Sequence, residues 1–464
     1  MNDDRFMLWT STLLGVLQMW CFFGFDMMSF LVEPICHSVR ERCPECIIQF
    51  AGYYGTAVLC FSYTIGNLIA PCFLPLLGAK GCLILSSTLF SVYAANFFYL
   101  RTYFFFPANV CCGFAFALFY AGGGSYALRH STDRFLSRNQ SIQWMVASLT
   151  TLLSGTFLIF SASVLKEHPG NETEISAKGT ENDAEYRQFS DKEIHLLSIG
   201  MSVLALASII LAFLLPKREL QGSLQKKVKN EVSLKKQICK VFWAMRQKSL
   251  LKVSFLFMST GSFISLFLTI YPTTMSFTDS LARNKNLVAY YCIACCVGEF
   301  IVGFSITLLS KRIRDFGLIP AMSLTCVLYV IVAVLMILFT PAMASIGPTK
   351  DHAIFETNQW ICILLGVLTG ALDGSANNAR MVAAAKGLPD EPAIAFSVSK
   401  FYQAAAQTIC LSLGSILNLH QIICVIGVVL LISVFCYISY IRNLSERRVS
   451  SEEKLPQEFE STNY

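Results

Sequence analysis

Residues 216–252 read PKRELQGSLQKKVKNEVSLKKQICKVFWAMRQKSLLK, with eleven basic residues and only two acids, Glu219 and Glu231. On both sides of this stretch the chain is apolar, and of its 464 residues 54% are hydrophobic and 14% charged. The apolar residues form runs of about 20, the length at which an α-helix spans a bilayer. Six runs precede the stretch and six follow it, at roughly 8–30, 51–73, 81–99, 103–126, 141–163, 194–215, 253–276, 287–309, 316–339, 358–381, 394–417 and 420–442. Because lipid offers backbone groups no hydrogen bonds, we predict an all-α polytopic membrane protein with twelve transmembrane helices.

Two sets of six helices joined by a long charged loop predict the major facilitator fold, with two bundles (6+6) around a midplane cavity. We therefore expect an N-terminal bundle at 1–215, a linker at 216–252, a C-terminal bundle at 253–442 and a tail at 443–464. Apolar and basic residues recur at helical spacing over 232–252, which predicts a short amphipathic helix lying on membrane lipid. The tail is polar, and we expect it to be disordered.

The distribution of charge predicts the orientation in the membrane. Lys and Arg are concentrated in segments that would share a side with both termini, whereas the long loop 164–193 on the other side has eight acids and four basic residues. The positive-inside rule therefore places both termini in the cytoplasm, and for this multi-pass protein we favour the plasma membrane over an endomembrane. The net charge of +6 follows from the same bias, so it does not indicate nucleic-acid binding.

Two modifications are predicted from this orientation. Sequons begin at Asn139, Asn171 and Asn443, and only Asn171 falls on the outer side, so we expect glycosylation there. Ser450 follows two arginines in the tail, a pattern that serine kinases favour, although we favour the alternative of an ordinary basic tail.

The cysteines predict a disulfide and no metal centre. Cys36, Cys43 and Cys46 share the outer loop between the first two runs, where oxidising conditions favour one disulfide whose pairing the sequence leaves open. No metalloprotease, P-loop, nucleophile-elbow or dinucleotide motif is present. We therefore predict neither an enzyme nor a bound cofactor.

Polar residues interrupt the tenth run, where residues 368–380 read LTGALDGSANNAR. Asp373, Asn377 and Arg380 are spaced to share one helix face. The eleventh run has a polar stripe at helical spacing, formed by Ser397, Lys400, Gln403 and Gln407. At a rise of 1.5 Å per residue, Asp373 lies about 12 Å and Lys400 about 9 Å from the inner surface. We predict a polar network facing the cavity; contacts between helices are the alternative, and Arg380 is near enough to the surface to snorkel.

Two further carboxyls lie in predicted helices. Glu299 is near the middle of the eighth run, and no basic residue of the second half lies at its depth. An acid at this depth is typical of proton-coupled carriers, although simple helix packing is an alternative. Asp26 lies near the outer end of the first run, where we expect it to be solvated.

Several segments resemble one known family. These segments are GYYGTAVLCFSYTIGNLIAPCFLPLLGAK at 52–80, GFAFALFYAGGGSY at 113–126, STDRFLSRNQSIQW at 131–144, VGEFIVGF at 297–304 and DEPAIAFSVSKFYQ at 390–403. Together they are similar to the uncoordinated-93-like family, a branch of the major facilitator superfamily described as ion channel regulatory proteins. The resemblance implies a facilitator fold that regulates a potassium channel or escorts a membrane receptor.

Two departures qualify what the resemblance implies. The loop PLLGAKG has Lys80 and no acid, so the gating ion pair customary between the second and third facilitator helices cannot form there. The sequence after Asp373 reads Asn377-Asn378-Ala379-Arg380, where the family tends to have Asn-Thr-Gln. We therefore favour a regulatory or escort protein, with a secondary transporter of a small ion or metabolite, proton-coupled through Glu299, as the alternative.

Overall fold

The computed structural model describes residues 2–132, 135–167, 185–218, 234–309, 312, 318–389 and 391–461, which are mostly helical. The elements of the first half are α1 (Asp3–Ser29), α2 (Val32–Arg42), α3 (Ala51–Ile69), η1 (Ala70–Cys72), α4 (Phe73–Ala95), η2 (Asn96–Phe98), α5 (Thr102–Arg129), α6 (Leu136–Glu167) and α7 (Asp191–Leu214). The linker contains α8 (Leu234–Met245). The second half comprises α9 (Lys248–Ser265), the π-helical η4 (Leu266–Ile270), α10 (Tyr271–Phe277), α11 (Asp279–Ala282), α12 (Leu287–Leu309), α13 (Ile319–Phe339), η5 (Ala342–Ser345), α14 (Gln359–Gly387), α15 (Pro392–Leu413) and α16 (Leu419–Ser461).

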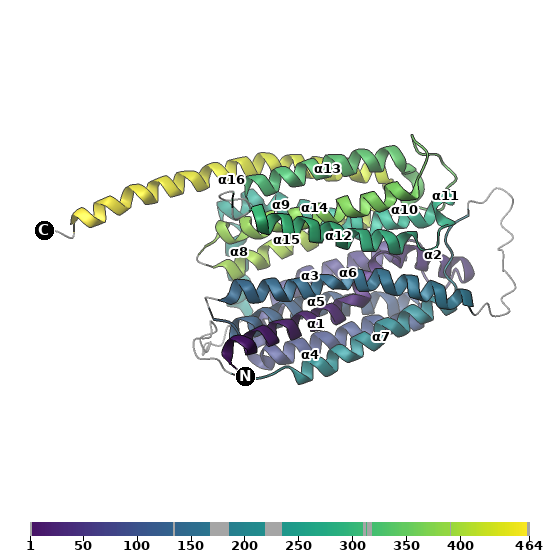
Figure 1. Cartoon of the computed structure of the whole chain (residues 1–464), viewed down its shortest axis with the longest axis horizontal. Coiled ribbons are helices and arrows are strands. Elements are labelled where there is room, and N and C mark those ends of the chain that lie inside the picture. The colour runs from purple at the N-terminus through teal and green to yellow at the C-terminus, as the bar shows by residue number, and fades with distance from the viewer. Residues whose placement is uncertain are drawn as a thin grey trace.

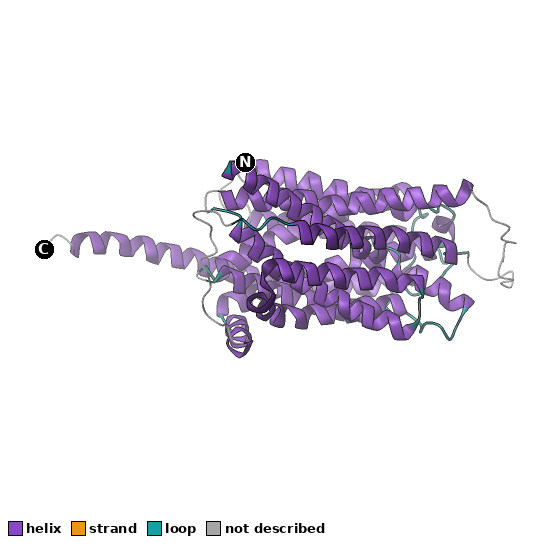
Figure 2. Cartoon of the chain, turned by 90° about the horizontal axis from the view of Figure 1, so that it is seen from below, coloured by secondary structure: helices purple, strands orange, loops and turns teal. Residues whose placement is uncertain are grey.

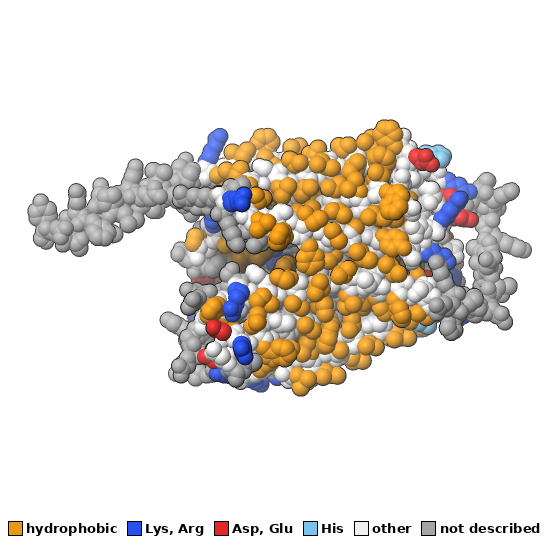
Figure 3. Space-filling model, viewed as in Figure 1, with side chains coloured by type: hydrophobic (Ala, Val, Ile, Leu, Met, Phe, Trp, Pro, Cys, Tyr) orange, Lys and Arg blue, Asp and Glu red, His pale blue; other side chains and the backbone are white. Residues whose placement is uncertain are grey.

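The long helices run side by side in two groups, one formed by the helices up to α7 and one by those from α9 onward (Figures 1 and 2). Both termini and α8 lie at one end of the molecule, which we call the terminal end. The helices α2, α10 and α11 lie at the opposite end, which we call the loop end. Hydrophobic side chains cover the middle of the face shown in Figure 3, and charged side chains gather at its two ends. This surface is that of an integral, multi-pass membrane protein in contact with lipid.

Ten helices of the described part of the chain are long and apolar enough to cross a membrane. The other two predicted segments, 51–73 and 394–417, form α3 and α15, whose most apolar stretches have a lower mean hydropathy than those of the other ten. These two helices pack against each other where the two halves meet. Their polar residues therefore face protein rather than lipid, as is usual for polar groups in membrane helices.

The linker and the tail are both helical where the structure describes them. The amphipathic helix predicted within 232–252 corresponds to α8, whose Lys240 forms an ion pair of 3.1 Å with Glu391 just before α15. The expectation of a disordered tail is wrong, because α16 continues beyond residue 442 to Ser461. Glu, Lys and Arg, which favour helix, are frequent in this extension.

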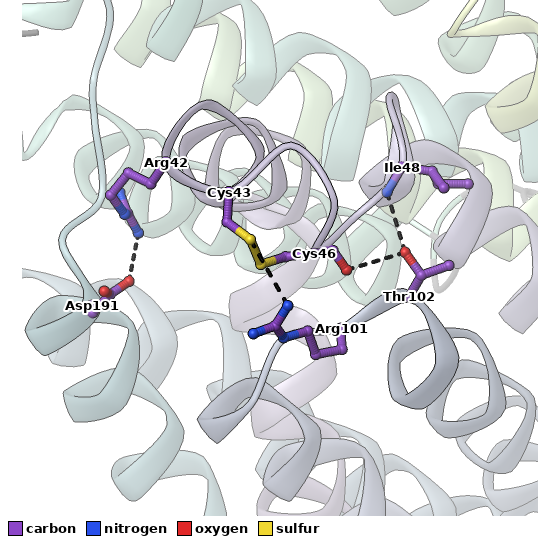
Figure 4. The surroundings of a disulfide bond; sticks show 7 residues. All are labelled: Arg42, Cys43, Cys46, Ile48, Arg101, Thr102 and Asp191. Atoms are coloured by element: carbon purple, nitrogen blue, oxygen red, sulfur yellow. Dashed lines mark hydrogen bonds and ion pairs between the residues drawn. A yellow bond between two sulfur atoms is a disulfide. The ribbon is translucent and has the colours of Figure 1, made fainter.

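A disulfide closes a short turn at the loop end. Cys43 pairs with Cys46, and Cys36 is a buried free thiol. The backbone N–H of Thr102 donates to the carbonyl oxygen of Cys46 at 2.9 Å, and the Thr102 hydroxyl contacts the same oxygen (Figure 4). The disulfide turn therefore fixes the position at which α5 begins.

Contacts between the two halves close the loop end. The segment 185–190, which precedes α7, reaches the second half, where the Arg187 backbone N–H donates to the carbonyl oxygen of Ser276 at 2.9 Å. The Tyr53 hydroxyl at the start of α3 donates to the carbonyl oxygen of Ser345 at 2.6 Å. Both contacts join residues far apart in the chain, and both would break if the halves separated at this end.

A buried carboxyl supports the start of α3 beside this closure. Glu33 of α2 is only 2% exposed, and its Oε2 accepts a hydrogen bond of 3.1 Å from the backbone N–H of Tyr53. Burial raises the pKa of Glu33 from 4.5 to about 8, although the hydrogen bonds from the Tyr53 and Gly52 backbones and the charge of Arg40 oppose the shift. The native protein therefore retains a proton on Glu33 at neutral pH.

This proton makes stability depend on pH in a defined window. Between pH 4.5 and about 8 the unfolded chain has lost the Glu33 proton and the native state has kept it, so native stability falls as pH rises. Relative to Glu33→Gln, the wild type should lose about 1.4 kcal/mol of unfolding free energy per pH unit, with no further loss above the native pKa. Thermal unfolding of both proteins in detergent from pH 5 to 9 measures this difference. An exposed control in the same loop, Glu45→Gln, should track the wild type, and a Glu33→Gln difference independent of pH would contradict the assignment.

Candidate functional site

A close crossing of α12 and α14 brings two carboxyls together inside the second half. A Cβ placed on Gly298 or on Gly370 would lie 2.0 Å from a backbone oxygen of the opposite helix. Only glycine permits backbones to approach this closely. Glu299 follows the first glycine and Asp373 comes three residues after the second, and their side chains interact electrostatically across the crossing.

A chain of hydrogen bonds runs from Asp373 to α15. The Asn377 amide donates to Asp373 Oδ1 at 2.9 Å, Arg380 Nε donates to Asn377 Oδ1 at 3.2 Å, and Arg380 Nη1 donates to Ser399 Oγ at 2.8 Å. Arg380 is 4% exposed, so the expectation that it snorkels to the surface is wrong. It stays buried because Asn377 and Ser399 accept hydrogen bonds from two of its nitrogens, and Asp373 balances its charge.

Lys400 of α15 lies near this series of hydrogen bonds but is not part of it. Its Nζ lies 5.1 Å from the centre of the Tyr120 ring of α5, a cation–π contact between the two halves. Lys400 interacts electrostatically with Asp373 and Arg380. Among the described residues, however, Lys400 forms neither an ion pair nor a hydrogen bond. The predicted partners Asp373 and Lys400 are therefore neighbours, and the direct bond of Asp373 is to Asn377.

Asp26 of α1, which we expect to be solvated, belongs to the same region and is half-buried. It interacts electrostatically with Glu299 and with Tyr120, and the hydroxyl group of Thr150 on α6 lies next to it. The residues that end α1 are buried, including Met28 at 0% exposure.

The charged side chains of this region are accessible although they lie within the helix groups. Asp26, Glu299, Asp373 and Lys400 are each half-buried, and all lie away from the ends of the molecule. The loop end is closed by contacts between the halves, such as that of Tyr53 with Ser345. Figure 3 shows the surface hollowed between the two groups at the terminal end. We therefore describe a polar site between the halves.

The comparison with protein families identifies the chain's family. The family model described as ion channel regulatory protein UNC-93 matches residues 43–438, which include most of both halves. This chain belongs to the UNC-93 family.

Similar proteins and structures agree with this assignment. The chain is 24% identical to the UNC93-like protein MFSD11 of Xenopus tropicalis over 438 residues, covering 90% of the chain and 93% of that relative. The corresponding Xenopus laevis protein is 23% identical over the same coverage. Among solved structures, a nucleoside transporter NupG aligns with a TM-score of 0.59 at 13% identity, covering 93% of this chain and 99% of that one. A POT family transporter in complex with 5-aminolevulinic acid aligns with a TM-score of 0.64 at 12% identity, covering 94% and 96%. These likenesses show the major facilitator transporter fold.

The remaining predicted site residues of this UNC-93 family member lie along α15. Gln403 is 4% exposed, and its side-chain oxygen has no hydrogen-bond partner among the described residues. Gln407 is half-buried, and its backbone oxygen is 3.5 Å from the Ser265 hydroxyl of α9. Gln403 also packs closely on α9, where a Cβ on Gly261 would lie 2.1 Å from its carbonyl oxygen. The polar stripe therefore combines helix contacts with one unsatisfied polar group.

The first half contributes residues to the polar site that the sequence did not predict. Tyr63 of α3 and Tyr120 of α5 both interact electrostatically with Arg380 of the second half. Tyrosine is common in membrane helices, so neither position is distinctive in the sequence. Lys80, which lacks the customary acidic partner, instead donates to the carbonyl oxygens of Phe213 and Leu215 at 2.6 and 2.9 Å. It thus satisfies backbone oxygens at the end of α7.

Proposed function

We propose that this UNC-93 family member binds a small charged solute at the polar site between its halves and carries it across the membrane together with protons. One observation carries the proposal. Glu299 and Lys400 are charged residues deep in the membrane-spanning part, half-buried and accessible, and neither forms an ion pair or hydrogen bond with any described residue.

The energetic cost of these residues supports a role beyond packing. An ionised side chain at the centre of a membrane helix costs about 2.5–3.5 kcal/mol on insertion scales. Residues that serve only as contacts between helices normally offset that cost with a direct partner, as Arg380 does with Asn377 and Ser399. Glu299 has no such partner among the described residues, and Lys400 has only the ring of Tyr120, so we expect a bound solute to pair with Lys400 and a transferred proton to bind Glu299.

Reconstitution in liposomes tests transport. The purified chain is incorporated into vesicles containing a pH-sensitive dye, and ions and small metabolites are supplied from outside. We expect at least one solute to drive proton movement, and Glu299→Gln to reduce that movement at least tenfold. Glu356→Gln, an exposed carboxyl at the loop end, is the matched control and should behave like the wild type. Solute-driven proton movement that survives Glu299→Gln would refute the role of this carboxyl, and vesicles silent to every solute would count against transport.

The family match favours a second candidate function, regulation of a potassium channel or escort of a membrane receptor. The matching family model is described as an ion channel regulatory protein over residues 43–438. Co-expression tests this candidate: the chain should change the current or surface level of a partner channel and copurify with it in mild detergent. If that effect persists in Glu299→Gln, regulation does not depend on proton transfer at the site.

The orientation in the membrane is part of the proposal. The basic linker and the basic short loops support cytoplasmic termini, so the hollow at the terminal end would open to the cytoplasm. Asn171, the predicted glycosylation site, lies outside the described residues, and Ser450, the predicted phosphorylation site, lies on α16. A glycosidase-induced gel shift that persists in Asn171→Gln would contradict this orientation.

A further inference from the structure

The charges of the polar site are separated into two poles. The cationic pole is formed by Arg380 of α14 and Lys400 of α15, and these two side chains interact electrostatically. The anionic pole is formed by Asp26 of α1 and Glu299 of α12, which also interact electrostatically. Asp373 lies between the poles, since it interacts with Lys400 and Arg380 on one side and with Glu299 on the other.

Tyr120 of α5 lies between the same two poles from the first half. Its ring faces Lys400 at 5.1 Å, and its hydroxyl interacts electrostatically with Asp26, Arg380 and Asp373. A molecule bound beside this ring would therefore have positive side chains toward α14 and α15 and negative side chains toward α1 and α12. The side chains come from both halves, so the arrangement exists only in the assembled fold.

Only part of this charge is already engaged within the protein. Asp373 and Arg380 are linked through Asn377, so part of their hydrogen-bonding capacity is already used. Lys400 has three N–H donors and forms no hydrogen bond with any described residue, and the Glu299 carboxyl likewise forms none. Gln403, one helical turn beyond Lys400, is 4% exposed with an unpartnered side-chain oxygen. A buried acceptor without a partner is energetically unfavourable, so it indicates a place where a ligand donor belongs.

We propose that the site takes a zwitterion, with its anionic group on Lys400 and its cationic group on Glu299 and Asp26. This inference rests on the proposed function and specifies its substrate class. A solute that is only cationic would leave the Lys400 ammonium unpaired, and one that is only anionic would leave the carboxyl pair unpaired. A molecule with both charges satisfies both poles, and an N–H of the same molecule can donate to Gln403. Amino acids and short peptides have this chemistry.

Ligands that lack one of the two charged groups test the inference. The full-length chain is purified in detergent, and its affinity is measured calorimetrically for leucine, for leucinamide, which lacks the anion, and for N-acetylleucine, which lacks the cation. The same three forms of alanylalanine extend the test to a longer molecule. We expect the zwitterion of at least one set to bind ten times more tightly than either of its edited forms.

Two variants test which side chain binds each charged group of the ligand. Lys400→Met should abolish the preference for the zwitterion over its amide while retaining the preference over its acetylated form. Glu299→Gln should have the opposite effect. The same substitutions outside the site, Lys240→Met on α8 and Glu356→Gln at the loop end, should retain both preferences. Thermal unfolding of each variant shows that it is folded before its affinity is compared.

The outcomes separate this inference from the proposed function. Tighter binding of the amide would show that the site prefers a cation, and tighter binding of the acetylated form would show that it prefers an anion. Either result would overturn the zwitterion proposal but not the proposal that the site binds a solute. Binding of none of the six probes would overturn the zwitterion proposal, while the liposome experiment decides whether any solute moves. Preferences that are unchanged in both Lys400→Met and Glu299→Gln would place the binding elsewhere and overturn the proposal.

Discussion

Arg380→Ala is expected to lower the free energy of unfolding by about 3–5 kcal/mol, the range typical of breaking a buried charge network by removing one partner. The guanidinium is 4% exposed and connects Asn377 on its own helix to Ser399 on α15. Its loss would leave both side chains without their donor and would remove a positive charge that balances Asp373. Thermal unfolding of the detergent-purified variant, together with its yield as a monodisperse protein, measures the effect.

Two companion variants show whether the loss arises from charge. Adding Asp373→Asn to Arg380→Ala should restore part of the stability, because the carboxylate left without compensation is removed. Lys400→Met should lower stability far less than Arg380→Ala, since Lys400 forms no ion pair or hydrogen bond with any described residue. Equal losses of stability in Lys400→Met and Arg380→Ala would contradict the assignment of that stability to the hydrogen bonds of Arg380.

Gly370→Ala is expected to destabilise the second half by about 1–3 kcal/mol, the usual cost of overpacking. The added methyl group would lie 2.0 Å from a backbone oxygen of α12, so α12 and α14 would have to separate by about an ångström. Separation would also move Glu299 away from Asp373. We therefore expect lower thermal stability together with weaker solute-driven proton movement in liposomes.

Gly124→Ala is the matched control for this steric effect. A Cβ on Gly124 of α5 would meet nothing within 4 Å. Both substitutions gain about the same helix propensity, up to 1 kcal/mol, so their difference isolates the close contact. Gly370→Ala with the stability of Gly124→Ala would show that the crossing adjusts without cost.

Much of the fold was predictable because the length of an apolar run indicates whether it forms a membrane-spanning helix. The first predicted run, 8–30, corresponds to α1, and the basic stretch 216–252 does separate two helix groups. The exceptions have physical reasons. The segments forming α3 and α15 are less apolar because they face each other, and α16 extends past residue 442 because its polar extension still favours helix.

The site was predictable only within single helices. The spacing of Asp373, Asn377 and Arg380 predicts a shared face, and hydrogen bonds connect all three. The contact of Lys400 with Tyr120 joins residues 280 positions apart, for which a single sequence contains no signal.

The pairing of α3 with α15 has a consequence for biosynthesis. More than 300 residues separate the end of α3 at Ile69 from the start of α15 at Pro392, and ribosomes add about 5–20 residues per second. The newly made α3 therefore waits for roughly 15–60 s before its partner emerges. During that interval the face of α3 that packs against α15 lacks the helix that covers it in the finished protein. A nascent chain that ends after the first half is thus expected to present an unfinished surface within the membrane, on which membrane chaperones and quality-control proteases can act.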